Sequence, residues 1–175
     1  MNHQQPEHEA EMQREENFHP DPIVQFRRWF EEAEAAGIAE ANAMVLATAS
    51  PNGEPSARTV LLKEADERGF VFYTNYESRK GKELEVNPRA SLVFFWKELQ
   101  RQVRVEGTVE RLPREESALY FATRPRESQL GAWASFQSRV LADRRTLMDR
   151  YAEMERRFRG MEIPLPDHWG GFRLV

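Results

Sequence analysis

The sequence predicts a mainly β fold in which α-helices are inserted between the strands of a small barrel. Short apolar runs rich in β-branched and aromatic residues recur along the 175-residue chain, and turn residues separate them. Between these runs lie segments whose apolar side chains recur at helical spacing. Five or six predicted strands in antiparallel succession, with inserted helices, are typical of a small β-barrel decorated by helices.

The first half of the chain is predicted to contain one helix and three strands. Asp21 and Pro22 begin the helix, because proline is favoured at the first helical position, and Gly37 ends it. Residues 51–53 form the turn after the first strand. The three strands are expected at 43–49, from Ser56 to about Glu64, and at 70–74.

The second half is expected to alternate again between strands and helices. Strict alternation of apolar and polar residues marks 102–110 as a strand with one face toward water. The other elements are a helix opening at Ser78, a strand at 90–96, a helix from 113 to 121, a short segment at 129–134, a helix at 143–158 and a strand beginning at Trp169. Because the chain stops inside that last strand, we expect either an incomplete C-terminus or an edge strand, and we favour the incomplete C-terminus.

The chain is predicted to divide into a flexible acidic tail (1–19) and one domain (20–175). The tail holds five acidic side chains and one basic side chain, and it is nearly free of large apolar groups. Without the tail, the chain's 29 acidic and 25 basic residues become equal in number. A general nucleic-acid surface needs a basic excess, so we expect no nucleic-acid partner and only local anion binding.

The residue types that the chain lacks exclude several classes of site. It has no cysteine, which excludes disulfides, thiol nucleophiles and cysteine-ligated metal centres. Three of its four histidines lie in the tail, so we expect neither a histidine triad nor a metal cage. The apolar runs are too short to span a bilayer, and we predict a soluble cytoplasmic protein without a membrane partner. If the protein is an enzyme, a bound cofactor is expected to supply its reactivity.

The segment from Ser78 to Lys82 opens a predicted helix with three cations in its first turn. Ser78 is a favourable N-cap, but the cations face the positive end of the helix dipole. A bound phosphate would make this arrangement favourable, since helix N–H groups and basic side chains would hold it together. Taken alone, the segment is better explained as a solvated basic turn, and an anion site is the alternative.

Other polar side chains beside the predicted strands and helix ends have both a structural and a functional interpretation. Arg58 and Lys63 flank an apolar strand, either as charges at its solvent boundary or as phosphate ligands. Trp133 and His168 are better explained as structural residues. The remaining candidates are Tyr73, Thr74, Gln102, Tyr120, Arg124, Arg126, Ser128, Gln137 and Ser138.

Six segments together make the chain resemble the pyridoxine (pyridoxamine) 5′-phosphate oxidase family. Residues 58–63 are similar to the family's strand R-x-V-L-L-K, and residues 70–80 to F-x-F-Y-T-N-x-x-S-R-K. The other four segments are 101–104 (R-Q-V), 120–126 (Y-F-x-x-R-P-R), 128–138 (S-Q-x-G-A-W-x-S-x-Q-S) and 164–172 (P-x-P-x-x-W-G-G-F). The resemblance extends from about Asp21 to the end of the chain, in the family's order and spacing.

The resemblance implies an FMN-binding split β-barrel that forms a homodimer with FMN at the subunit interface. The implied FMN-binding residues are Arg58, Thr59, Val60, Leu61, Leu62, Lys63, Tyr73, Thr74, Arg79, Lys80, Gln102, Gln137 and Ser138. The implied ligands of the substrate phosphate are Lys63, Tyr120, Arg124 and Ser128. The implied activity is oxidation of pyridoxine or pyridoxamine 5′-phosphate to pyridoxal 5′-phosphate by hydride transfer from the substrate C4′ carbon to flavin N5. O2 then reoxidises the flavin and yields H2O2, and the amine substrate also releases ammonia.

Two parts of the family pattern are not found in the sequence. The family continues past the position of Val175 into a W-x-x-x-x-x-R-L-H-x-R strand, which places Arg and His over the substrate. The catalytic residues are therefore expected beyond Val175, and none is assigned within the chain. The family's N-terminal R-x-x-Y element is also not matched, because Arg14 is followed by Asn17 at the tyrosine position.

Three other functions stay open from the sequence. A related flavin oxidase could act on another compound, such as a phenazine precursor. A non-catalytic barrel could bind FMN or pyridoxal phosphate with a shortened chain. A nucleic-acid-binding barrel is disfavoured by the neutral domain and the interrupted basic patches.

Overall fold

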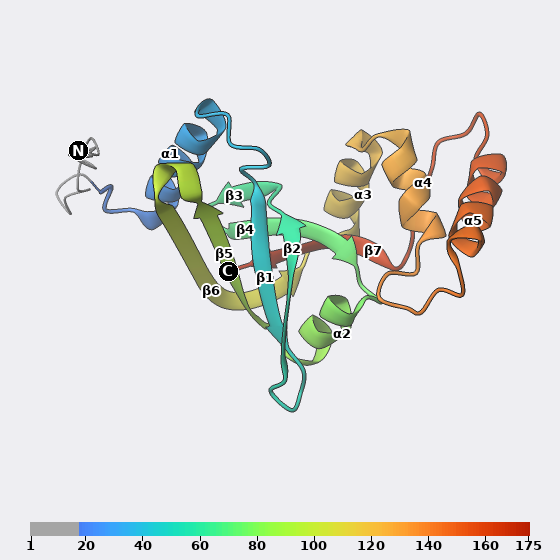
Figure 1. The fold of residues 1–175 in the computed structure, drawn as a ribbon, viewed down its shortest axis with the longest axis horizontal. Helices are drawn as coiled ribbons and strands as arrows, with labels where there is room; N and C mark the ends of the chain where they lie inside the picture. Colours follow the sequence, from blue (N-terminus) through green and yellow to red (C-terminus); the bar gives the residue numbers. More distant parts are fainter. Residues whose placement is uncertain (1–17) are drawn as a thin grey trace, which may run out of the picture.

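The computed structural model describes residues 18–175, and its strands form one curled antiparallel sheet in the order β2-β1-β5-β6-β7-β4-β3 (Figure 1). The strands are β1 (Ala43–Ala49), β2 (Pro55–Leu61), β3 (Glu64–Asp66), β4 (Gly69–Asn75), β5 (Arg89–Trp96), β6 (Arg101–Arg111) and β7 (Trp169–Leu174). The helices are α1 (Pro22–Ala35), α2 (Arg79–Val86), α3 (Arg114–Thr123), α4 (Arg126–Ala134) and α5 (Arg144–Arg157), and a 3₁₀ turn, η2 (Lys97–Leu99), follows β5. The predicted mainly β fold with inserted helices is confirmed.

The long strand β6 joins the two halves of the sheet. Residues 101–108 of β6 pair with β5, and residues 109–111 pair with β7. At the opposite side, the Lys63 N–H donates to the Val71 carbonyl oxygen at 2.9 Å, where the chain passes from β2 into β3. The sheet therefore curls until the end of β2 lies beside β4, which is the architecture of a split barrel.

Two predicted elements and one alternative left open by the sequence differ from the structure. The second strand was expected to run to about Glu64, but β2 ends at Leu61, and the three-residue strand β3 pairs with β4 instead of β1. The last strand is not an edge strand, because β7 lies between β6 and β4 and all six of its residues are buried. The predicted segment 129–134 is the second part of α4, which begins at Arg126.

The barrel core is closed at one end by α1. The Phe26 ring of this helix contacts Phe70 and Phe94 with ring centroids 4.9 and 5.0 Å away. The Asp21 carboxylate caps α1 by accepting from the Ile23 N–H at 2.8 Å, as the sequence predicts. Most of the predicted tail (1–19) lies outside the described residues. The ring of Phe18, which is described, packs edge-on against the Trp29 ring of α1.

A second apolar cluster holds three helices beside β7. Figure 1 shows α3, α4 and α5 grouped together on the side of the sheet away from α1. The cluster is formed by Phe121, Leu130, Phe158, Ile163 and Trp169. This packing fixes α3 and α4 opposite β4, and that arrangement forms the site described below. Within residues 18–175, no helix is long and apolar enough to cross a membrane.

Candidate functional site

A cavity of about 670 Å³ lies between the sheet and the helices α3 and α4. Its volume falls within the range typical of small-molecule and cofactor sites. Its lining residues are Thr59, Val60, Leu61, Lys63, Tyr73, Thr74, Asn75, Lys80, Tyr120, Thr123, Arg124, Pro125, Ser128, Gly131, Ala132, Ser135, Gln137 and Trp169. The cavity therefore combines a strand edge, the start of α2 and two helices that come much later in the chain.

The start of α2 is built by Ser78 and Gly81. Ser78 is the N-cap, as predicted, and its hydroxyl oxygen accepts from the Gly81 N–H at 3.3 Å while it donates to the Asn75 carbonyl at 2.7 Å. A Cβ atom on Gly81 would lie 2.1 Å from the Tyr76 carbonyl oxygen. Only glycine permits this close approach, which places the first turn of α2 against the end of β4.

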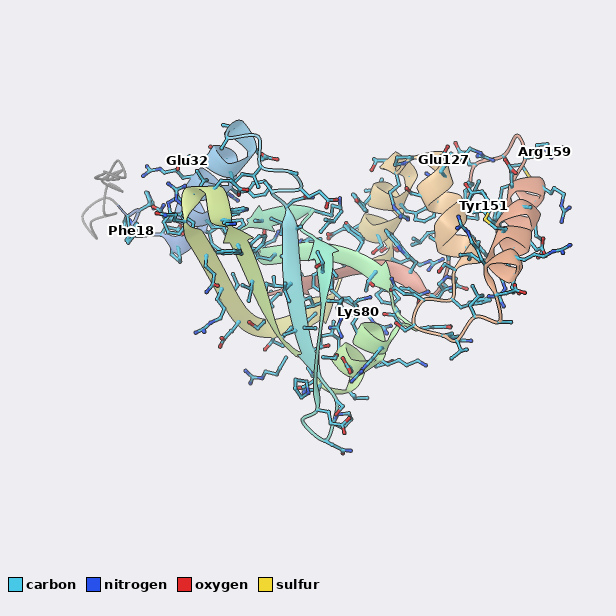
Figure 2. All side chains as sticks on the ribbon, viewed as in Figure 1. Phe18, Glu32, Lys80, Glu127, Tyr151 and Arg159 are labelled. Atoms are coloured by element: carbon cyan, nitrogen blue, oxygen red, sulfur yellow. The ribbon has the colours of Figure 1, made fainter. Side chains whose placement is uncertain are left out.

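Lys80 brings a buried positive charge into the cavity. Its side chain is 6% exposed, and Figure 2 shows it where α2 begins, near the end of β4. The Nζ atom donates to Gln137 Oε1 at 2.8 Å and to Thr74 Oγ1 at 3.1 Å, and both acceptors are neutral. Burial, together with the nearby charge of Arg58, lowers the pKa of Lys80 to about 8. A buried cation with neutral partners can hold an anion, such as the phosphate of a cofactor.

Beside Lys80, the buried carboxylate of Glu83 connects α2 to β1 and β2. It accepts from Ser56 Oγ at 2.6 Å and from Arg79 Nε at 2.8 Å, and it lies 3.5 Å from Arg58 Nη2. Burial would raise the pKa of Glu83, but the hydrogen bonds from Ser56, Thr48 and Arg79 lower it to about 2. Glu83 is therefore ionised at neutral pH, and it forms the charged centre of a hydrogen-bonded network.

Three aromatic rings form another wall of the cavity. Tyr73 stacks on Tyr120 with ring centroids 3.9 Å apart, and on Trp169 at 5.4 Å. The Arg124 guanidinium lies 4.5 Å from the centre of the Trp169 ring, and its Nη1 atom is buried without a hydrogen-bond partner. Burial raises the pKa of Tyr73 to about 12, so its phenol keeps its proton well above neutral pH. The free donor of Arg124 is a second position at which an anion can bind.

The cavity gathers most, but not all, of the predicted site residues. It collects Thr59, Val60, Leu61, Lys63, Tyr73, Thr74, Lys80 and Gln137 from the predicted cofactor set, and Lys63, Tyr120, Arg124 and Ser128 from the predicted substrate set. Arg58 and Arg79 belong to the network around Glu83 and do not line the cavity. Leu62 is buried in the barrel core, Gln102 is exposed on β6 opposite Phe95, and Ser138 is exposed in the loop after α4. The structure of one chain does not bring these last three to the cavity.

Other candidate residues have structural roles. Arg126 donates to the carbonyl oxygens of Phe158 and Met161, and so joins α4 to the segment after α5. The Trp133 indole donates to the Pro164 carbonyl at 2.8 Å. A ring nitrogen of His168 lies 3.0 Å from the Ala132 carbonyl. Among residues 18–175, no group of three or more metal-ligating side chains is placed to hold a metal ion.

Among the residues that sequence reasoning missed, two matter most to the site. Trp169 was predicted only as the beginning of a strand, although its position in the W-G-G-F segment was an available signal. Glu83 was not singled out, although it is the first acid after the cations of the basic turn, four residues beyond Arg79. Acids and arginines at this spacing meet on one helix face, so the pair could have been predicted.

Comparison with known proteins places the chain in a family. The family model described as pyridoxamine 5′-phosphate oxidase matches residues 30–157. This chain belongs to that family. A relative from Rubrobacter xylanophilus, named pyridoxine/pyridoxamine 5′-phosphate oxidase, is 64% identical over 160 residues, which cover 91% of this chain and 74% of the relative. A relative of the same name from Nostoc sp. is 54% identical over 156 residues, which cover 89% and 73% of the two chains.

Solved structures agree with the split-barrel fold. PhzG from Burkholderia lata, solved in complex with tetrahydrophenazine-1-carboxylic acid, has a TM-score of 0.86 and 32% identity, and the match covers 91% of this chain and 78% of PhzG. An FMN-binding protein from Nostoc punctiforme has a TM-score of 0.67 at 16% identity, covering 86% and 80%. At that low identity the second match shows the shared fold alone.

Proposed function

We propose that this protein is an FMN-dependent oxidase that converts pyridoxine 5′-phosphate or pyridoxamine 5′-phosphate to pyridoxal 5′-phosphate in the cytoplasm. The observation that carries the proposal is the presence of two separate cationic positions, Lys80 and Arg124, in one cavity. A phosphorylated cofactor and a phosphorylated substrate together need two such positions. Family membership and the names of the relatives support the same activity.

The residues around Lys80 fit the FMN phosphate. The Lys80 ammonium is buried against neutral acceptors, so a phosphate would stabilise its charged form. The strand β2, which contributes Thr59, Val60 and Leu61 to the cavity, is an end strand of the sheet. Its outer backbone groups are therefore free to bond a flat ring system. Bound FMN would supply the hydride acceptor for the oxidation.

The residues around Arg124 fit the phosphate of the vitamer. Arg124 holds a free donor, and Lys63, Tyr120 and Ser128 line the cavity beside it. The stacked rings of Tyr73 and Tyr120 offer an apolar wall that excludes water from a bound pyridine ring. In the reaction the alcohol loses two electrons and two protons, and O2 is reduced to H2O2. The amine additionally takes up water and releases ammonia.

A turnover assay with flavin binding measured in parallel tests the proposal. Purified protein loaded with FMN is expected to form pyridoxal 5′-phosphate and peroxide in equal amounts from at least one of the two vitamers. Protein that binds FMN but converts neither vitamer would refute the oxidase. Arg124→Ala is expected to raise KM without weakening FMN binding, because Arg124 lies at the other cationic position.

A related oxidase that acts on a phenazine precursor is the second candidate. It is favoured by the TM-score of 0.86 to PhzG. A substrate panel with peroxide release as the readout separates the two activities. A barrel that binds FMN or pyridoxal phosphate without catalysis would release no peroxide with any compound of the panel.

We further propose a homodimer with FMN at its interface. The outer face of β1, β2 and β5 exposes Val45, Leu61 and Phe95, with exposed fractions of 40%, 36% and 64%. Val45 pairs with Thr59 on one side and Val93 on the other, so the apolar surface is continuous across the strands. Exposed apolar patches of this kind mark interaction surfaces. Leu61 and Thr59 also line the cavity, so a partner on this face would complete the site.

Sedimentation velocity tests the homodimer. The wild-type protein is expected to sediment as a dimer, and Val45→Glu as a monomer with weakened FMN binding, because the new charge would be buried at the interface. Glu153→Gln, at an exposed position on helix α5 and not on this face of the sheet, serves as the control. A wild-type monomer that holds FMN would contradict the proposal.

A further inference from the structure

Glu83 is the one carboxylate in direct contact with the arginines beside Lys80, within the described residues. Its exposed fraction is 6%, and its two oxygens accept from side chains on three elements: Thr48 on β1, Ser56 on β2 and Arg79 on α2. A buried carboxylate with this many partners is held in one position. It can therefore determine the positions of the groups around it.

The direction of each hydrogen bond in this network is determined by the charged groups at its ends. Arg58 can only donate, and it donates to Thr48 Oγ1 at 2.6 Å and to Ser56 Oγ. Both hydroxyls must then give their own protons to Glu83, which as a carboxylate can only accept. Glu83 therefore orients Arg58 through two hydroxyls, and it orients Arg79 directly.

The net charge of the cluster suits a phosphate monoester. Arg58, Arg79 and Lys80 contribute three positive charges, and Glu83 neutralises one of them. The remaining charge of +2 matches a phosphate monoester, which carries about −1.5 to −2 at neutral pH. A stronger excess of positive charge would be harder to bury in the cofactor-free protein.

We infer that Glu83 is a positioning residue that holds Arg58 and Arg79 in place for the FMN phosphate. The inference rests on the proposed FMN site and extends it from Lys80, which lines the cavity, to the neighbouring Arg58, Arg79 and Glu83, which do not. It also predicts the sign of a substitution effect. If Glu83 were only a nearby negative charge, its removal would tighten the binding of an anion. If it positions the arginines, its removal weakens that binding.

Fluorescence titrations of the full, cofactor-free chain with FMN and with riboflavin test the inference. Glu83→Gln is expected to raise the Kd for FMN about tenfold, less than the loss of a direct charged hydrogen bond, because Glu83 acts through the arginines. The Kd for riboflavin, which lacks the phosphate, is expected to stay unchanged. Glu85→Gln is the matched control, because it makes the same chemical change on an exposed side chain of the same helix.

Several outcomes would overturn the inference. FMN binding that is unchanged or tighter in Glu83→Gln would do so, as would an equal loss of riboflavin affinity. Ser56→Ala gives an independent test, because it removes one hydroxyl of the network and leaves Glu83 in place. Its effect on FMN affinity is expected to be less than additive with that of Glu83→Gln, and full additivity would contradict the shared network. Wild-type protein that binds no FMN would instead refute the proposed function, before any variant is compared.

Discussion

Replacing Lys80 by methionine should change stability and flavin binding in opposite directions. Burial lowers the pKa of Lys80 from 10.5 to about 8, and its side chain is 6% exposed. Because one pKa unit corresponds to about 1.4 kcal/mol, the charged form costs the cofactor-free protein at most about 3 kcal/mol at neutral pH. Lys80→Met removes this cost but also loses hydrogen bonds worth about 1 kcal/mol each. We therefore expect a net stabilisation of about 1 to 2 kcal/mol at pH 7.

The pH dependence of the stability difference distinguishes the loss of a buried charge from a change in side-chain packing at this position. Between the folded pKa of about 8 and the unfolded value of 10.5, unfolded wild-type chains bind more protons at Lys80 than folded ones. Wild-type stability therefore rises with pH in this window, and the advantage of Lys80→Met should shrink by about 1 kcal/mol between pH 7 and pH 9. Urea unfolding of the cofactor-free proteins at both pH values measures this change. An advantage that is equal at the two pH values would refute the reasoning.

The same substitution should weaken FMN binding, because the phosphate loses a charged donor. A loss of about thirtyfold in affinity is expected from one charge-assisted hydrogen bond. Lys82→Met is the control, since Lys82 lies on the same helix but is exposed to solvent. It should change neither the pH dependence of stability nor the Kd for FMN.

Three further predictions concern other parts of the site. Gly81→Ala should destabilise the protein by about 3 kcal/mol, because the new Cβ would lie 2.1 Å from the Tyr76 carbonyl oxygen, and a melting temperature near wild type would contradict the close approach. Tyr73, whose pKa is raised to about 12 by burial, should show no tyrosinate absorbance at pH 10.5, which a difference spectrum against Tyr73→Phe can check. Arg124→Lys should raise the KM for a phosphorylated vitamer about tenfold with FMN affinity retained, because lysine lacks the planar fork, and an unchanged KM would exclude Arg124 as a phosphate ligand.

The helices and the longer strands could be predicted from the sequence because local signals mark them. Asp21 and Pro22 begin α1, Ser78 caps α2, and the alternation in 102–110 follows the pleat of β6. The short strand β3 could not be separated from β2 in this way. Its three residues have no periodicity of their own, and only pairing with β4 defines it.

The candidate site was predictable as a set of residues but not as an arrangement. Motif similarity pointed to Lys80, Tyr120 and Arg124, which the structure brings into one cavity. Neither the stack of Tyr73 on Trp169 nor the network around Glu83 could be read from the sequence. Both arrangements depend on contacts between strands and helices that are far apart in the chain.

The central position of β7 has a consequence for how the protein folds. Tyr73 on β4 pairs with Gly171 on β7, so nearly a hundred residues of chain must be organised before these strands meet. Pairing over such a distance is slow compared with the formation of local helices and hairpins. The wall formed by Tyr73 and Trp169 needs this pairing, so we expect the cavity to take shape after most of the sheet has formed. A folding intermediate trapped before that step would have a largely native β1–β2 hairpin but no formed cavity to bind a flavin.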